Sequence, residues 1–500
     1  MKEFDPRQVA FIQLRGEPYQ RRVQGRFGIE AIDCNRTLNN LAEDTSYHSS
    51  IVSRIDHESE HLRQFLRGEG YNNIDNKLKH GENLTFDDAF SLATFVCAGL
   101  NIPLNKSLKG NLQNEVSHET HLLQATALLA AMSAKESYSS LTPDEVAGIV
   151  AATIRLDTAV RIPILNKKVL AFGGMGGDKG YPLNGERSKL FSLSTLASVA
   201  LSVDGPVHKH HSYPNTSKVA GQNAIEAFGA RSDFHSIEAF RSVFSDTNLV
   251  MSSCHDTRTL HTLSHLLRGE TINHVIGPLA FTLSRDTAVQ AMIGVNEKIH
   301  PETIIEALKV LQEKGFQKYD NSVAYCGTDV TRVIPEMLDP VEYSCSNTAK
   351  MHVLIDEVAP VPYVTLAAFL VKGENMGTFA LYPEDFYTED ELMEIPFQNL
   401  TIHNSIDDIM YYNGLALEGK DIAKSRYLAM TIGLGLFVRY GLDKVNALNR
   451  QSKRVNKVYL REYTKIGYEI LVSGLAQQQM RNYIESTNQH AGIRQSVRFF

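Results

Sequence analysis

The chain has 500 residues, of which 43% are hydrophobic and 21% are charged, and its formal net charge is −7. These values are typical of a globular protein with more than one domain, and the lack of a basic excess argues against nucleic acid or an anionic membrane as its main partner. The cysteines, which form no CxxC pair, indicate reduced thiols: Cys34, Cys97, Cys254, Cys326 and Cys345. The first residues form no apolar leader and no apolar run could span a bilayer, so we expect a cytoplasmic protein.

The first 160 residues predict helices without a recognisable chemical motif. Residues 1–80 are polar. Residues 120–132 are rich in Ala and Leu and predict a helix. A second helix is expected to begin at Thr142-Pro143-Asp144-Glu145, because a capping residue, a proline and an acidic first turn follow one another there.

From residue 168 onward, strand and helix patterns alternate. Strands are expected at 168–172, 205–208 and 321–326, and helices at 196–203, 216–228 and 301–315, while residues 287–295 form an apolar stretch. Helices are expected again beyond 401, most clearly over 422–440 and 459–484. The fold class that follows is α/β: a small all-helical domain, a larger α/β domain with a mostly parallel central sheet, and a helical C-terminal part packed on it.

The segment after the first of these strands points to anion binding. Gly173-Gly174-Met175-Gly176-Gly177-Asp178 lets the backbone come close to a ligand and turn its N–H groups toward an anion. The hydroxyl-rich run Ser192-Leu193-Ser194-Thr195 opens the next helix, where N–H groups favour a phosphate. Lys209 follows and adds a positive charge, so we predict a phosphate-binding site.

Several motifs in this order resemble the anthranilate phosphoribosyltransferase family, which is related to the pyrimidine nucleoside phosphorylases. Gly174–Asp178 resembles the family's GTGGD, Phe191–Thr195 its FNIST, and Lys209–Ser212 its KHGN. Asn273–Leu279 resembles FNLLGPL, and Tyr382–Phe386 matches a further landmark. The resemblance covers residues 82 to 486 and implies binding of phosphoribosyl pyrophosphate (PRPP) with Mg²⁺, in a homodimer.

The resemblance also implies a domain organisation. Residues 1–80 would be an extension of unknown role, 81–160 part of the helical domain, and 161–400 the α/β phosphoribosyl-binding domain. Residues 401–488 would supply its C-terminal helices, and 489–500 a tail.

Site residues follow from the same motifs. No covalent nucleophile is expected, because the protein's task is to neutralise the leaving pyrophosphate and to orient the acceptor. The substrate-binding residues implied are Gly174, Gly176, Gly177, Asp178, Ser192, Ser194, Thr195, Lys209, His211, Ser212, Thr216 and Ser217. Mg²⁺ would be held by Ser194 and the adjacent carboxylates Asp356 and Glu357, which suit a hard cation. This alignment requires an insertion of about 25 residues, Gly327 to Met351, and Asp329 is the competing carboxylate.

The chain departs from the family pattern on the acceptor side. His211 and Ser212 stand where KHGN has glycine and asparagine, and Ser264 and His265 stand where an arginine for the anthranilate carboxylate is expected. Ser192 and Met175 replace the asparagine of FNIST and the threonine of GTGGD. These changes predict a nitrogen acceptor other than anthranilate.

Two other functions remain open at this stage. A nucleoside or nucleotide phosphorylase would use phosphate and would not need Asp356 and Glu357. A non-catalytic relative that binds nucleic acid or another ligand would need a local basic face, for which Arg15, Arg21, Arg22 and Arg26 are candidates. His208, His210, His211 and His255 lack acidic or cysteine partners at the spacing of a zinc site.

Overall fold

A computed structural model describes most of the chain from residue 69 to residue 490. The described residues are 69–101, 118–156, 164, 167–176, 180–183, 186–188, 191–211, 220–231, 237–253, 272–400 and 406–490. They divide into two compact units, one comprising residues 1–161, 233–237 and 253–282, and the other the remainder. In the described part of the chain, no helix combines the length and the apolar character needed to cross a membrane.

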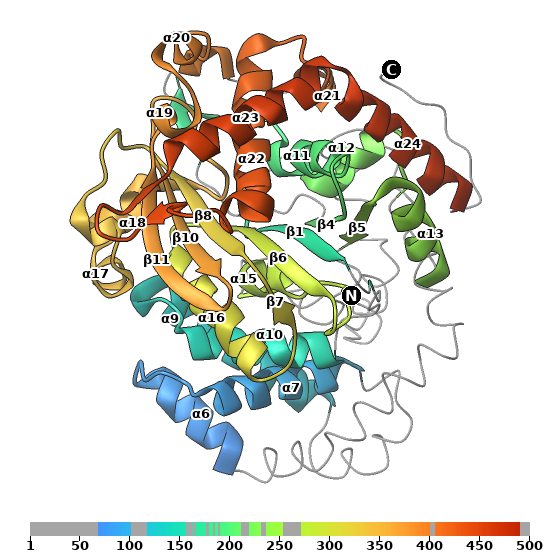
Figure 1. The fold of residues 1–500 in the computed structure, drawn as a ribbon. Coiled ribbons are helices and arrows are strands. Elements are labelled where there is room, and N and C mark those ends of the chain that lie inside the picture. The colour runs from blue at the N-terminus through green and yellow to red at the C-terminus, as the bar shows by residue number, and fades with distance from the viewer. Residues whose placement is uncertain are drawn as a thin grey trace. The chain divides into compact units, whose positions relative to one another are not determined.

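The first unit is helical (Figure 1). Its described elements are α6 (Glu69–Lys79), α7 (Phe86–Asn101), α9 (His118–Ser139), α10 (Pro143–Leu156), α15 (Asn273–Ile276) and the 3₁₀ turn η3 (Gly277–Leu279). The helix expected over 120–132 is therefore longer than its Ala/Leu-rich part, and the one expected at Thr142-Pro143 begins at Pro143, directly after the predicted capping residue. A Cβ on Gly148 would collide with the backbone of Phe86, so glycine permits the close approach of α10 to the start of α7.

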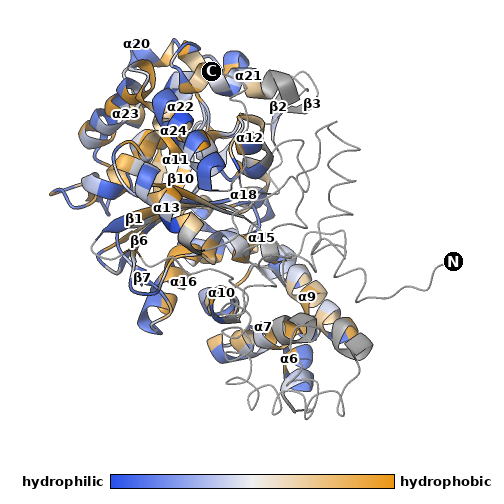
Figure 2. Ribbon diagram, turned by 90° about the vertical axis from the view of Figure 1, so that its right-hand side faces the viewer, coloured by the Kyte–Doolittle hydropathy of each residue, from blue (hydrophilic) through white to orange (hydrophobic). Residues whose placement is uncertain are grey.

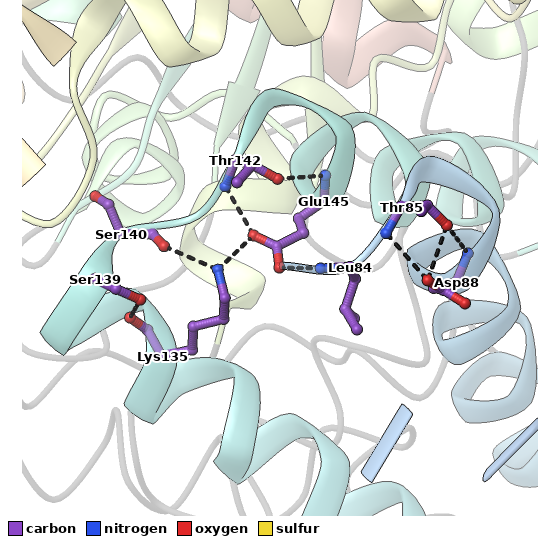
Figure 3. A network of polar contacts seen from close by, with 8 residues as sticks. All are labelled: Leu84, Thr85, Asp88, Lys135, Ser139, Ser140, Thr142 and Glu145. Atoms are coloured by element: carbon purple, nitrogen blue, oxygen red, sulfur yellow. Dashed lines mark hydrogen bonds and ion pairs between the residues drawn. The ribbon is translucent and has the colours of Figure 1, made fainter. Parts of the chain in front are cut away.

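A buried ion pair joins α9 to the start of α10 (Figure 3). Lys135 Nζ lies 2.8 Å from Glu145 Oε2, and both side chains are almost fully buried. The carboxylate also accepts hydrogen bonds from the N–H groups of Leu84 (2.9 Å) and Thr142 (2.8 Å). Lys135 donates in addition to the carbonyl of Ser140, so the buried charges are paired and hydrogen-bonded.

The second unit is built on a central sheet that has nine strands among the described residues, in the order β11-β10-β8-β6-β1-β4-β5 with β7 beside β6 and β9 beside β8. The strands are β1 (Lys168–Gly174), β4 (Val207–His211), β5 (Leu249–Ser253), β6 (Ala288–Gly294), β7 (Lys318–Tyr319), β8 (Ser322–Thr328), β9 (Val353–Ile355), β10 (Thr365–Val371) and β11 (Glu374–Leu381). Strands β4, β1, β6 and β8 run parallel, and β9, β10 and β11 add antiparallel pairs. The predicted α/β class with a mostly parallel sheet is confirmed.

Helices cover both faces of this sheet (Figure 1). The described helices of this unit are α11 (Leu193–Leu201), α12 (Gly221–Ala227), α13 (Ile237–Thr247), α16 (Pro301–Glu313), α17 (Pro340–Cys345), α18 (Asn347–His352), α19 (Pro383–Phe386), α20 (Glu389–Leu392), α21 (Ile406–Leu417), α22 (Ile422–Leu436), α23 (Lys457–Val472) and α24 (Leu475–His490). Shorter elements are the turns η4 (Pro335–Met337), η5 (Phe397–Leu400) and η6 (Phe437–Gly441), and the small ribbons β2 (Tyr181–Leu183) with β3 (Glu186–Ser188) and β12 (Leu448–Asn449) with β13 (Arg454–Val455).

The core of this unit lies between the sheet and its helices. Figure 2 shows hydrophobic residues gathered around β10 in the middle and hydrophilic residues on many outer helix turns. Seven successive residues of β8 are buried, as expected for a strand covered on both faces. The single helix expected over 459–484 is wrong: Gly474, with a φ of +79°, separates α23 from α24.

Candidate functional site

The connections of the sheet identify the edge at which a ligand is expected. The chain runs from β1 through α11 to β4 in one direction along the sheet, and from β6 through α16 to β8 in the other. Because such crossovers are right-handed, α11 and α16 lie on opposite faces, as Figure 1 shows. A crevice is expected outside the carboxyl ends of β1 and β6, where the direction reverses. Gly174 and Gly294 are paired at these ends.

Three glycines let the segment after β9 cross this edge. A Cβ on Gly174 would lie 2.6 Å from Asp356 Oδ2, and one on Gly294 would overlap the Asp356 carbonyl. A Cβ on Gly327, in β8, would lie 2.9 Å from the Glu357 carbonyl. The absence of these side chains therefore allows Asp356 and Glu357 to sit against the ends of β1, β6 and β8.

Asp356 is fixed by the glycine loop. The N–H of Gly176, a residue with a φ of +65°, donates to Asp356 Oδ2 at 2.8 Å. The N–H of Met175 donates to the carbonyl of Gly294 at 3.0 Å, and Asn296 Nδ2 donates to the carbonyl of Gly176 at 3.4 Å. The Gly176 N–H thus holds a carboxylate in this structure, and the loop is tied to β6.

Glu357 lies against the start of α11. Its Oε1 accepts a hydrogen bond from the Ser194 N–H at 3.3 Å. Its Oε2 is buried and finds no hydrogen-bond partner among the described residues. Burial first, and then the neighbouring Asp356, raise the pKa of Glu357, while Lys209 and Ser194 act in the opposite direction.

Lys209 supplies positive charge near this pair. It lies in β4, all five residues of which are buried. Burial lowers the pKa of Lys209, and the attraction of Glu357 and Asp356 opposes that shift. The buried ammonium group of Lys209 therefore lies in the electrostatic field of two half-buried carboxylates.

This donor set fits Mg²⁺. Mg²⁺ prefers oxygen ligands, keeps several waters and is commonly bound by one or two carboxylates together with substrate phosphates. The buried Glu357 Oε2, which has no partner in the described part of the chain, is an acceptor of the required type. Within the described residues, no group of three or more His, Cys, Asp or Glu side chains is arranged so that it could hold a metal ion.

The start of α11 carries the hydroxyl groups that the sequence singles out. Ser192 is half-buried, and Asn413 of α21 binds both its N–H and its hydroxyl, each at 3.2 Å. Thr195 is buried, and a Cβ on Gly221 would lie 2.9 Å from its Oγ1 and 3.0 Å from the Cβ of His211. The structure thus brings Thr195 and His211 together beside α12.

The histidines of β4 are neutral groups. Burial lowers the pKa of His208 and of His210 to about 3. The pKa of His211 also lies well below its ordinary value, for the same principal reason. None of them supplies a positive charge at neutral pH.

The remaining predicted residues have different outcomes. Asp329, the competing carboxylate, is paired with His352 Nδ1 at 2.7 Å. Gly177, Asp178, Ser212, Thr216 and Ser217 lie outside the described residues, as do Ser264, His265, His255 and the N-terminal arginines.

Sequence reasoning missed several residues that shape this site. Gly294 and Gly327 lie at or near strand ends and carry no motif of their own, so only the fold reveals why a side chain would not fit. Asn413 is far from Ser192 in sequence, and no local signal links the two. Tyr325, paired with Gly294 in the sheet, has its pKa raised by burial and then by Glu357 and Asp356.

Known proteins similar to this chain share its fold and part of its sequence. No protein-family model matches the chain. Anthranilate phosphoribosyltransferases of Methanococcus maripaludis strain C6 and Methanococcus vannielii are each 28% identical to it over 237 residues, which is 47% of this chain. The match spans 61% of the length of either relative.

Solved structures align over more of the chain. Anthranilate phosphoribosyltransferase from Thermus thermophilus aligns with a TM-score of 0.55 and 19% identity, over 83% of this chain and 99% of its own. The Saccharomyces cerevisiae enzyme in complex with PRPP and Mg aligns with a TM-score of 0.58 and 15% identity, over 85% and 99%. At these identities the structural likeness establishes the fold.

Proposed function

We propose that this chain, which resembles anthranilate phosphoribosyltransferases in fold and in part of its sequence, is a Mg²⁺-dependent phosphoribosyltransferase. It would move the 5-phosphoribosyl group from PRPP to a nitrogen atom of a small acceptor. In this displacement the bond from C1 of the ribose to the pyrophosphate oxygen breaks and a bond from C1 to nitrogen forms. The nitrogen then gives up a proton to the solvent, and pyrophosphate leaves.

One observation carries the proposal: Asp356 and Glu357 lie half-buried against the glycine-rich end of β1, with the buried Lys209 close enough to influence both. A phosphorylase or a nucleic-acid-binding relative has no need of such a pair. Buried like charges beside each other are costly unless a cation joins them. A bound Mg²⁺ would neutralise charge on the pyrophosphate and on the carboxylates.

The chain's own residues would orient the donor. Gly176 holds Asp356, and Ser194 holds Glu357, so the two carboxylates are preorganised. Lys209 would attract the phosphates as a point charge. The hydroxyl groups of Ser192 and Ser194 and the loop residues Gly177 and Asp178 would complete the contacts to PRPP.

The acceptor is proposed to differ from anthranilate, although the relatives' names give that substrate. A positively charged side chain is the group that binds a carboxylate such as that of anthranilate most strongly. His211, which stands at the glycine of KHGN, is buried and its pKa is well below the ordinary value. A neutral imidazole suits an amine or a ring nitrogen better than a carboxylate.

Calorimetric titration with PRPP, with and without Mg²⁺, tests the donor half of the proposal. We expect binding that requires Mg²⁺ and that is lost in the double variant D356N/E357Q. D329N is the matched control, because it removes a carboxylate paired with His352 and leaves the pair intact. Unchanged PRPP affinity in the double variant would refute the metal assignment, and lack of PRPP binding by the unaltered protein would refute the function.

A further inference from the structure

The proposed function leaves one feature unexplained, which is the pair of hydrogen bonds between the side chain of Asn413 and Ser192. Asn413 lies in α21 and is fully buried, whereas Ser192 immediately precedes α11. Asn413 Oδ1 accepts a hydrogen bond from the Ser192 N–H, and Asn413 Nδ2 donates one to Ser192 Oγ, each at 3.2 Å. Two residues that are 221 positions apart are thus joined at both polar ends of one carboxamide.

The orientation of this carboxamide is determined by chemistry. A backbone N–H can only donate, so the atom of Asn413 that faces it must be the carbonyl oxygen. The NH₂ group then faces Ser192 Oγ and can only donate to it. The second contact of Nδ2 is a weak one to Met410 Sδ at 3.9 Å, in keeping with this assignment.

These contacts determine what the proton of the Ser192 hydroxyl group can do. A serine before a helix ordinarily caps it by accepting from the N–H groups of the first turn. Ser192 makes no such side-chain cap, although its carbonyl accepts the N–H of Leu196 at 3.0 Å. Its oxygen is occupied as an acceptor by Asn413, so its own O–H remains available to donate.

We propose that Asn413 is a positioning residue that makes the Ser192 hydroxyl a dedicated hydrogen-bond donor to the anionic group of the substrate. The inference rests on the proposed function and names a residue that none of the motifs contains. Ser192 stands at the position of the asparagine in FNIST, and here the carboxamide of Asn413, from another helix, hydrogen-bonds to the residue at that position. Ser194, two residues further on, holds Glu357 through its N–H, so the donor would lie beside the proposed Mg²⁺ site.

Near-isosteric variants separate this role from a merely structural one. In N413D, one oxygen still accepts the Ser192 N–H, but the other now attracts the hydroxyl proton and removes the donor. In S192A the donor is absent altogether. In N413L the hydroxyl keeps its proton but loses its orientation, and N413S serves the same purpose if the leucine variant does not fold.

The experiment is calorimetric titration of each variant with PRPP and Mg²⁺, and separately with inorganic pyrophosphate and Mg²⁺, alongside thermal unfolding. We expect S192A and N413D each to weaken PRPP binding about 10- to 100-fold, the loss of one hydrogen bond to a charged group. The N413L variant should weaken it less. In the S192A background, N413L should change the affinity less than about twofold, because no hydroxyl remains to be oriented.

The outcomes distinguish the inference from the function on which it rests. If the unaltered protein binds no PRPP, the proposed function fails. If it binds PRPP and N413D binds it equally well, the function stands and the role of Asn413 is refuted. Additive losses in S192A/N413L, or a loss of PRPP affinity in N413L as large as that in N413D together with a lowered unfolding temperature, would show that Asn413 only supports the fold.

Discussion

The substitution of Gly174 by alanine gives the sharpest test of how the carboxylate pair is held. The added Cβ would lie 2.6 Å from Asp356 Oδ2, whereas ordinary van der Waals contact begins near 3.4 Å. The carboxylate must therefore move by about 0.8 Å. The backbone of Gly174 is an ordinary strand, so alanine introduces no strain other than this contact.

The displacement breaks the hydrogen bond from the Gly176 N–H, which is 2.8 Å long in the present arrangement. A hydrogen bond to a charged group contributes about 1.5–3 kcal/mol, which corresponds to about a 10- to 100-fold loss of Mg²⁺-dependent PRPP affinity. Calorimetry measures this loss, and circular dichroism verifies that the fold is kept. G414A is the matched control, since a Cβ there meets nothing within 4 Å. Wild-type PRPP affinity in G174A would refute the reasoning.

Two further predictions concern stability. K135M should lower the free energy of unfolding of the helical unit by about 3–5 kcal/mol, because it leaves the buried Glu145 carboxylate without its partner. Urea denaturation measures this loss, and a change below about 1 kcal/mol would contradict the prediction. Burial lowers the pKa of His300 from 6.5 to about 4. Its folded pKa is depressed, so up to about 3 kcal/mol of stability, present above pH 6.5, is lost as the pH falls from 6.5 to about 4. In H300N, whose amide can still cap α16, urea denaturation should show a shallower loss over this range, and an identical pH dependence would argue against the assignment.

The elements that the sequence predicts best are those with local causes. The strand that becomes β1 ends at a glycine cluster, and the helix α10 begins at a capping residue followed by proline, so both boundaries are encoded within a few residues. The break between α23 and α24 was missed because the apolar periodicity continues through Gly474, whose positive φ ends the first helix.

The candidate site could be predicted only in part. The glycine loop, the Ser192–Thr195 run and Lys209 lie close together in the sequence and carry their chemistry in recognisable motifs. Gly294, Gly327 and Asn413 act through contacts across the fold, and each looks ordinary where it stands in the chain. Their importance follows from what occupies the neighbouring space, which only the three-dimensional arrangement provides.

The charge balance of the site explains why its parts belong together. When both are ionised, the half-buried Asp356 and Glu357 bring two negative charges and the buried Lys209 brings one positive charge, so the group carries an excess of negative charge. Burying an uncompensated charge costs free energy, which is why burial and Asp356 raise the pKa of Glu357. The fold nevertheless fixes both carboxylates through Gly176, Ser194 and the row of glycines at the strand ends. A hydrophobic pair would be less costly at this position, so the arrangement supports our proposal that a divalent cation and a polyanion bind here and restore the balance.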